Sequence, residues 1–217
     1  MDRKAIKEAV QKAKQAAKER KFTESIDLSI GLKNINLKDP SKRFRAEIVL
    51  PHRPNKPVRL AVVGPDDVLD KAKEYGVAYT LTKDQLEALA KDPKEAKKFA
   101  KSVDYVLAVP QMMAEVGKNL GRYLGPLGKS PSVLPPNADL GTMIDRYSRT
   151  TKFRLRQNPV IHARVATRDM NDDEIAENIE VVLRDIENRL EQGAQNIKHV
   201  HVKTTMGPAV EIGGAEA

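Results

Sequence analysis

The stretch KHVHVKTTMGPAVEI, residues 198–212, decides the fold of this chain. Side chains of a strand point alternately to its two faces, so Val200 and Val202 share one face while the histidines and lysine around them share the other. A polar segment, residues 204–208, interrupts the alternation before a second short run begins. The pattern predicts a strand, a tight turn and a short second strand.

The predicted turn holds two hydroxyl groups and a thioether on a restricted backbone. Gly207 permits backbone angles that other residues avoid, and Pro208 fixes its own φ and lacks an N–H. We expect the turn to display the side chains of Thr204, Thr205 and Met206 with little flexibility. On these residues alone, an ordinary hairpin turn without a ligand is the simpler interpretation.

A second segment, KFTES at residues 21–25, follows a basic helical stretch and opens an alternating run at residues 25–32. Together with the KTTMGPAVEI segment, it resembles the universal large-subunit ribosomal protein family that binds the base of the mobile stalk beside the tRNA exit site. The stretch GRYLGPLGKSPSVLPPNADL, residues 121–140, is similar to the archaeal form of that family. The resemblance extends over essentially the whole chain.

This resemblance implies a place in the large ribosomal subunit, in the cytoplasm, with the stalk base of ribosomal RNA as the main partner. It further implies that an inserted domain moves with the stalk while deacylated tRNA leaves the exit site. Family members also repress translation of their own messenger RNA, which implies the same role here. We expect a monomer when the protein is free of RNA, without membrane association.

We predict that the two segments lie side by side in one sheet and contact RNA together, since RNA is recognised by shape and through 2′-hydroxyls. Phe22, by its type alone, is a candidate for the core, whereas the resemblance places it on the RNA-contacting surface. Glu24 would repel a phosphate, so its carboxylate either accepts from a base amino group or orients a neighbouring cation. The predicted RNA-contacting residues are Lys21, Phe22, Thr23, Glu24, Ser25, Arg45, Lys203, Thr204, Thr205, Met206 and Gly207.

Composition excludes several classes of protein. The chain has 217 residues, 40% of them hydrophobic, and no Cys. The lack of Cys rules out disulfides and thiolate-bound metals and fits a reducing compartment. The first twenty residues are too charged for a signal peptide, and no apolar run reaches membrane-spanning length.

Positive charge is concentrated in the first third of the chain. The net charge is +8, and residues 1–63 contain 16 basic and 7 acidic side chains, against 13 and 12 in residues 64–151 and 9 and 11 in residues 152–217. Residues 152–168 carry five basic side chains and no acidic one, whereas residues 169–192 carry nine acidic against two basic. Such segregation is typical of a protein that binds a polyanion.

Hydrophobic periodicity changes twice along the chain, which predicts two domains. A helix at residues 2–20 and half-buried strands characterise the ends. The middle alternates continuous apolar runs with helices, the first with Asp66 as its candidate N-cap, as expected for a parallel sheet covered on both faces. We predict an α/β protein of two domains: a split α+β sandwich, residues 1–63 plus 152–217, and an inserted three-layer Rossmann-like α/β domain, residues 64–151.

The segment GPLGKS, residues 125–130, ends like a phosphate-binding loop and raises the alternative of a nucleotide-binding enzyme that uses the inserted domain. The first glycine of that motif is replaced by Tyr123, and prolines follow where a helix should begin. We therefore interpret this segment, residues 125–130 within a Gly/Pro-rich stretch at residues 117–136, as a surface loop in contact with RNA or tRNA. No nucleophile and base stand out, so we predict no catalytic residue, no cofactor and no enzyme activity.

Histidines offer one further pattern. His199 and His201 share a strand face, as metal ligands sometimes do. No acidic residue lies beside them in the sequence, and only His52 and His162 supply further imidazoles. We predict no metal site.

Overall fold

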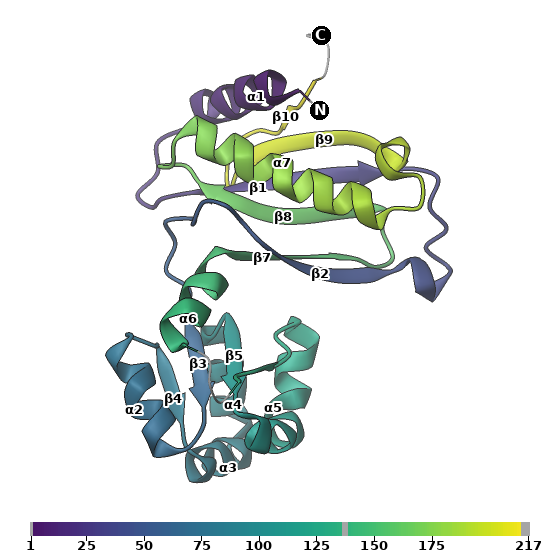
Figure 1. Ribbon diagram of the computed structural model, residues 1–217. Helices are drawn as coiled ribbons and strands as arrows, with labels where there is room; N and C mark the ends of the chain where they lie inside the picture. Colours follow the sequence, from purple (N-terminus) through teal and green to yellow (C-terminus); the bar gives the residue numbers. More distant parts are fainter. Residues whose placement is uncertain (1, 136–138, 214–217) are drawn as a thin grey trace. The chain divides into compact units, whose positions relative to one another are not determined.

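The computed structural model describes residues 2–135 and 139–213 (Figure 1). The chain divides into two compact units, the terminal unit of Met1–Lys56 with Arg149–Ala217 and the inserted unit of Pro57–Ser148. The predicted boundary at residue 63 is wrong, because Leu60–Val63 pair on both sides with strands of the inserted unit. Within the described ranges, no helix has both the length and the apolar character needed to cross a bilayer.

The terminal unit joins the two ends of the chain in one layered α+β structure. Its elements among the described residues are α1 (Arg3–Ala16), β1 (Ser25–Leu32), η1 (Pro40–Lys42), β2 (Phe44–Val49), β7 (Thr150–Leu155), β8 (Val160–Thr167), α7 (Asp172–Arg189), η3 (Gly193–Asn196), β9 (Ile197–Thr204) and β10 (Val210–Glu211). Antiparallel strands form a sheet in the order β10-β9-β1-β8, and β2 and β7 form a separate antiparallel pair. The predicted adjacency of the strand that follows KFTES and the strand that precedes the turn is confirmed, because β1 pairs with β9.

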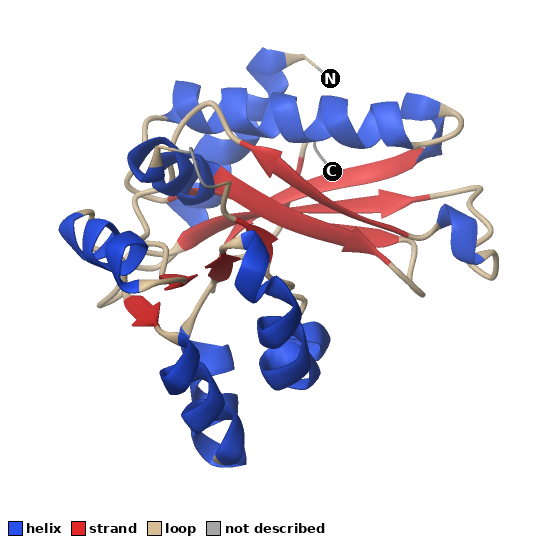
Figure 2. Ribbon diagram, turned by 60° about the horizontal axis from the view of Figure 1, so that its bottom comes forward, coloured by secondary structure: helices blue, strands red, loops and turns tan. Residues whose placement is uncertain are grey.

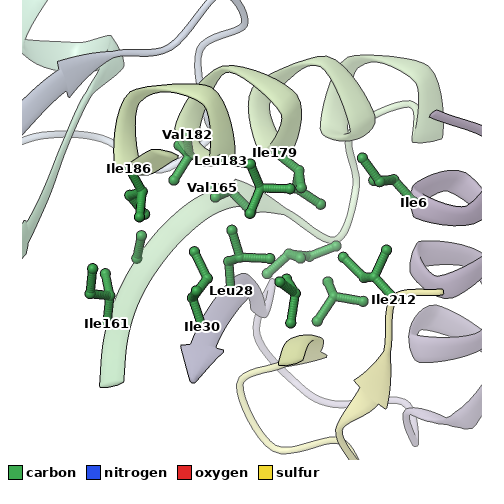
Figure 3. Packing of buried hydrophobic residues seen from close by; sticks show 14 of the residues in the cluster. Ile6, Leu28, Ile30, Ile161, Val165, Ile179, Val182, Leu183, Ile186 and Ile212 are labelled. Atoms are coloured by element: carbon green, nitrogen blue, oxygen red, sulfur yellow. The ribbon is translucent and has the colours of Figure 1, made fainter. Parts of the chain in front are cut away.

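Strand alternation directs the apolar side chains of this sheet to the face that helices cover. Leu28 and Ile30 of β1 are fully buried, as are Val200 and Val202 of β9. Figure 3 shows side chains of α7, among them Ile179, directed toward those of β1 and β8. The apolar side of α7 therefore forms one side of the core.

Helix α1 packs beside α7 through a thin, alanine-rich stripe. Three cations of α1 form ion pairs with acidic side chains in the first turns of α7. Arg3 lies 2.6 Å from Glu177, Lys7 lies 2.9 Å from Asp173, and Lys14 lies 2.7 Å from Asp172. Part of the positive charge that predicts polyanion binding is thus neutralised by ion pairs between α1 and α7.

The chain leaves the terminal unit and returns to it at neighbouring points. At the end of the β2–β7 pair, the N–H of Leu50 donates to the carbonyl of Arg149 at 2.9 Å. The proline-rich segment that follows, residues 51–57, is held at two places, because the N–H groups of His52 and Asn55 donate to side chains of α7 and β8 at 2.9 and 3.1 Å. The insertion therefore starts from a fixed segment rather than from a free linker.

The inserted unit is a parallel sheet between two layers of helices. Its described elements are β3 (Leu60–Val63), α2 (Asp66–Glu74), β4 (Tyr79–Leu81), α3 (Lys83–Lys91), α4 (Pro93–Ser102), β5 (Tyr105–Ala108), η2 (Pro110–Met112), α5 (Met113–Leu127), β6 (Ser132–Val133) and α6 (Leu140–Arg149). The strand order is β4-β3-β5-β6. In β3, Ala61 and Val63 face one apolar core and Val62 faces the other. The predicted α/β class is confirmed, but Asp66 is the first residue of α2 and Pro65 is its N-cap.

The segment that suggested a phosphate-binding loop ends a helix instead of beginning one. Helix α5 runs through residues 117–127, and Gly128, with φ of 71°, terminates it in the left-handed conformation. The ammonium group of Lys129 donates to the carbonyls of Ala100 and Val103 at 2.8 and 2.5 Å, and burial lowers its pKa. The predicted surface loop, residues 125–130, is therefore wrong for residues 125–127, which belong to α5.

We expect the terminal unit to fold without the inserted unit, because its sheets and core use described residues of the terminal unit alone. Lys56 lies six residues beyond Leu50, so it is within roughly 22 Å of the point where the chain returns. Replacing Pro57–Ser148 by about ten Gly/Ser residues should give a product with one cooperative urea transition by circular dichroism. A product without such a transition would contradict the independence of the two units.

Candidate functional site

The two segments singled out in the sequence meet at one end of the β1–β9 pair. Ile26 lies opposite Thr204 in the register. Beyond that position, the N–H of Thr205 donates to the carbonyl of Ser25 at 3.0 Å. The predicted side-by-side arrangement of the KFTES segment and the turn is therefore confirmed.

Glu24 is the buried anchor of this junction, with an exposed fraction of only 1%. One carboxylate oxygen, Oε1, accepts from the N–H of Met206 at 2.8 Å. The other, Oε2, lies 3.3 Å from a guanidinium nitrogen of Arg168. Of the two roles considered for Glu24, the structure supports the orientation of a cation, because the carboxylate is buried and both oxygens have partners.

Arg168 connects this junction to helix α1. Its guanidinium donates to the carbonyls of Lys14, Ala17 and Lys18 at 3.3, 3.2 and 3.1 Å. These groups belong to the last turn of α1 and the residues just beyond it, and the helix ends at Ala16 rather than at residue 20 as predicted. Arg168 was not predicted as a site residue, although a buried Glu requires a nearby cation.

The two threonines of the turn differ in their surroundings. Thr204 is fully buried, and within the described part of the chain its Oγ1 has no hydrogen-bond partner. The Oγ1 of Thr205 accepts from the N–H of Ser25 at 3.1 Å and also lies 3.3 Å from the carbonyl of that residue. The expectation that the turn displays both hydroxyls is thus wrong, since one is buried and the other closes the turn onto β1.

Gly207 is required by close packing rather than by its backbone angles. A Cβ atom at this position would overlap Oγ1 of Thr204 and lie 3.3 Å from Cβ of Ala17. The N–H of Gly207 donates to the carbonyl of Thr204 at 3.2 Å, which closes the turn. The turn is therefore pressed between β9 and the end of α1.

What remains exposed is a small apolar surface with cations beside it. Phe22 and Met206 are 54% and 61% exposed, so Phe22 is not a core residue. Lys21 and Thr23 are exposed next to Phe22. We call these four residues the edge patch. An aromatic ring and a thioether held on a fixed backbone suit contact with an unpaired base or a sugar, and Lys21 suits contact with a phosphate.

Two further predicted residues lie apart from the edge patch. Lys203 is half-buried on β9 and faces away from the core, opposite Asp27 of β1. Arg45 is exposed on β2, in the two-stranded sheet, opposite Arg154. The structure thus brings Lys203 next to the turn but places Arg45 in a different sheet.

Metal binding finds no support among the described residues, where no group of three or more His, Cys, Asp or Glu side chains has a suitable arrangement. The rings of His199 and His201 lie 4.9 Å apart in an edge-to-face arrangement.

Replacing Thr205 by Val should lower the free energy of unfolding by about 1 kcal/mol, because the N–H of Ser25 loses its acceptor. Thr205→Ser keeps the hydroxyl and should unfold like the parent chain in a urea titration. Equal stability of all three proteins would show that the hydroxyl does not hold the turn. If Thr205 acted only through contact with RNA, Thr205→Val would barely change the free energy of unfolding. The hydrogen bond to Ser25 replaces that expectation.

Comparison with known proteins gives a consistent result along the chain. The model of the family described as "Ribosomal protein L1p/L10e family" matches residues 10–208. The "Large ribosomal subunit protein uL1" of Pyrococcus abyssi (strain GE5 / Orsay) is 44% identical over 214 residues, which cover 98% of this chain and 97% of the relative. The protein of the same description from Methanothrix thermoacetophila is 44% identical over 207 residues, 95% of this chain and 98% of the relative. That from Thermococcus kodakarensis is 42% identical over 212 residues, 97% and 98% of the two chains.

Proposed function

Because the chain belongs to the ribosomal protein L1p/L10e family, we propose that it is a non-enzymatic component of the large ribosomal subunit that docks on the stalk base of ribosomal RNA. One observation carries the docking site. Phe22 and Met206 come from opposite ends of the chain. The buried carboxylate of Glu24, paired with Arg168, holds both segments at one end of the sheet with the side chains of Phe22 and Met206 exposed.

In this proposal the edge patch recognises shape. The backbone of the turn is fixed at Met206 through Glu24 and at Thr205 through Ser25. RNA therefore meets a surface that is already ordered, which reduces the entropy lost on binding. Phe22 and Met206 supply apolar contact, and Lys21 and Lys203 supply attraction to phosphates. Ser25, Thr23 and Gly207 contribute polar groups and close approach of the backbone.

Further roles follow from the family rather than from the edge patch. We infer that the protein acts in the cytoplasm, within the ribosome, and that the inserted unit takes part in the release of deacylated tRNA from the exit site. Repression of its own messenger RNA would use the edge patch as well, provided that the messenger presents the same RNA shape. The alternative of a nucleotide-binding enzyme loses its main support, because the GPLGKS segment ends a helix and its lysine is bonded to carbonyls.

The direct test is to express the tagged protein in an archaeal host and sequence the RNA that copurifies with it. We expect strong enrichment of the stalk base of large-subunit ribosomal RNA over the rest of the ribosomal RNA. A matched chain with Phe22→Ala and Met206→Ala should fold normally, since both side chains are exposed, and should lose the enrichment. Recovery of RNA without any preferred segment, or the same enrichment in both proteins, would contradict the proposed site.

A further inference from the structure

Helix α4 of the inserted unit is buried on one side only. In Figures 1 and 2, helices lie on both sides of the short strands of this unit. Ala96, Phe99 and Ala100 of α4 are buried and pack, together with α3 and α5, against one side of the parallel sheet. The other side of α4 is exposed, so its side chains are accessible to a partner.

The exposed side of α4 carries four lysines in one row. They are Lys94, Lys97, Lys98 and Lys101, and all four are exposed. Their spacing of three and four positions places the side chains on the same side of the helix. At about 1.5 Å per residue the row is roughly 10 Å long, which corresponds to about three phosphates along one strand of a nucleic acid. We call these four residues the lysine row.

The fold itself gives the lysine row little compensation. In the part of the chain that the structure describes, only Lys98 of the row forms an ion pair, at 3.7 Å from Glu95, and both side chains are exposed. Lysines three and four positions apart repel each other, which destabilises the helix. The ammonium group of Lys129 donates to the carbonyls of Ala100 and Lys101 at 2.8 and 3.3 Å, so the end of α4 already has a cation. Neither pairing within the chain nor capping of the helix therefore accounts for the row.

The chemistry of the lysine row favours a polyanion over a protein surface. Protein interfaces are held mainly by aromatic and arginine anchors in a desolvated centre. None of the large apolar side chains that are exposed among the described residues lies on α4. A lysine ammonium is a point charge that attracts phosphate without reading a base. The row therefore fits the phosphodiester backbone of a nucleic acid.

We propose that the lysine row is a second RNA contact, which binds the backbone of the same ribosomal RNA molecule that the edge patch docks on, outside the docked segment. The inference rests on the proposed function. The two crossings between the units are tied together, because the N–H of Leu50 donates to the carbonyl of Arg149 at 2.9 Å. RNA held by the terminal unit therefore meets the inserted unit at a high effective concentration, at which a few exposed lysine contacts are sufficient.

Two transcribed RNAs test this inference. One is the stalk-base fragment of large-subunit ribosomal RNA, and the other is the same fragment extended by the ribosomal RNA helices on either side of it. The affinity of the full chain for each is measured by fluorescence anisotropy at constant ionic strength. We expect about tenfold tighter binding of the extended RNA, because about two or three exposed charge contacts contribute a few-fold each. The slope of log affinity against log salt should be steeper by roughly two for the extended RNA.

The decisive variant carries Lys97→Gln and Lys98→Gln together. It should lose most of the gain with the extended RNA and bind the short fragment within about twofold of the affinity of the parent protein. Lys71→Gln with Lys73→Gln on α2 is the matched control, because it removes the same charge from a helix whose lysines are interspersed with acids, with Lys73 at 2.8 Å from Asp70. This control should keep the full gain. Lys97→Arg with Lys98→Arg preserves the charge and should keep the gain as well.

The outcomes separate the two proposals. A parent protein that binds neither RNA overturns the proposed function and this inference with it. Equal affinity of the parent for both RNAs, a gain that persists in the decisive variant, or an equal loss in the α2 control overturns this inference alone. So does a gain that free deacylated tRNA abolishes while the short fragment stays bound, because the lysine row would then bind tRNA instead.

Discussion

Replacing Arg168 by Met is expected to lower the free energy of unfolding by about 3 kcal/mol, which a urea titration measures. The substitution leaves the carboxylate of Glu24 buried without a cation, and breaking a buried pair from one side costs roughly 3–5 kcal/mol. The lower part of that range applies because the side chain of Arg168 is 28% exposed. RNA affinity should fall more than about tenfold, since a carboxylate that turns toward water releases the N–H of Met206.

A double variant separates the charge from the packing. Glu24→Gln combined with Arg168→Met buries no charge, and the amide oxygen of Gln still accepts from the N–H of Met206. We expect it to recover at least half of the lost stability and most of the RNA affinity. A double variant as unstable as Arg168→Met alone would show that the guanidinium acts through the carbonyls of α1 rather than through Glu24.

The second large effect is expected for Gly207→Ala, which should lower both the stability and the RNA affinity of the protein. The added methyl group would overlap Oγ1 of Thr204, which is fully buried and has little room to move. Overpacking of this kind costs about 1–3 kcal/mol, and the turn has to open to relieve it. We expect RNA affinity to fall between about tenfold and 100-fold, measured by anisotropy with the stalk-base fragment.

Its control removes the obstructing atom. Thr204→Ala in the Gly207→Ala background deletes Oγ1 and should restore much of the RNA affinity, although the lost methyl group keeps the stability below that of the parent. Thr204→Ala alone should bind RNA nearly as well as the parent protein. If the double variant binds no better than Gly207→Ala, the steric account of Gly207 is wrong.

Local patterns were enough to predict most of the elements in this fold. Strict alternation over residues 25–32 predicted β1 with the bounds found in the structure. The same alternation puts Thr204 on the buried face of Val200 and Val202. Because threonine is polar, its hydroxyl was instead expected to be exposed in the turn. In α5, Val116, Leu120 and Leu124 repeat every four residues, a helical spacing that outweighs the glycines and proline between them.

The contact between Glu24 and Arg168 inside the candidate site could not be predicted from sequence patterns, for a physical reason. The partner of Glu24 lies 144 positions away, among five cations of residues 152–168 that look equivalent in the sequence. Only the pairing of β1 with β8 brings Arg168 to this carboxylate. The members of the edge patch, by contrast, were predicted from the family resemblance of two short segments, since residue type alone favoured the core for Phe22.

The pairing of β1 with β8 and β9 also sets an order of events during synthesis. β1 ends at Leu32, whereas β9 begins at Ile197. At about 5–20 residues per second, roughly 8–33 s separate the emergence of these two strands. The inserted unit has all of its sheet partners within its own span and can form during that interval. The edge patch cannot exist before β9 and the turn after it emerge. A nascent or truncated chain that lacks them is therefore unable to capture RNA, and docking requires synthesis through Gly207.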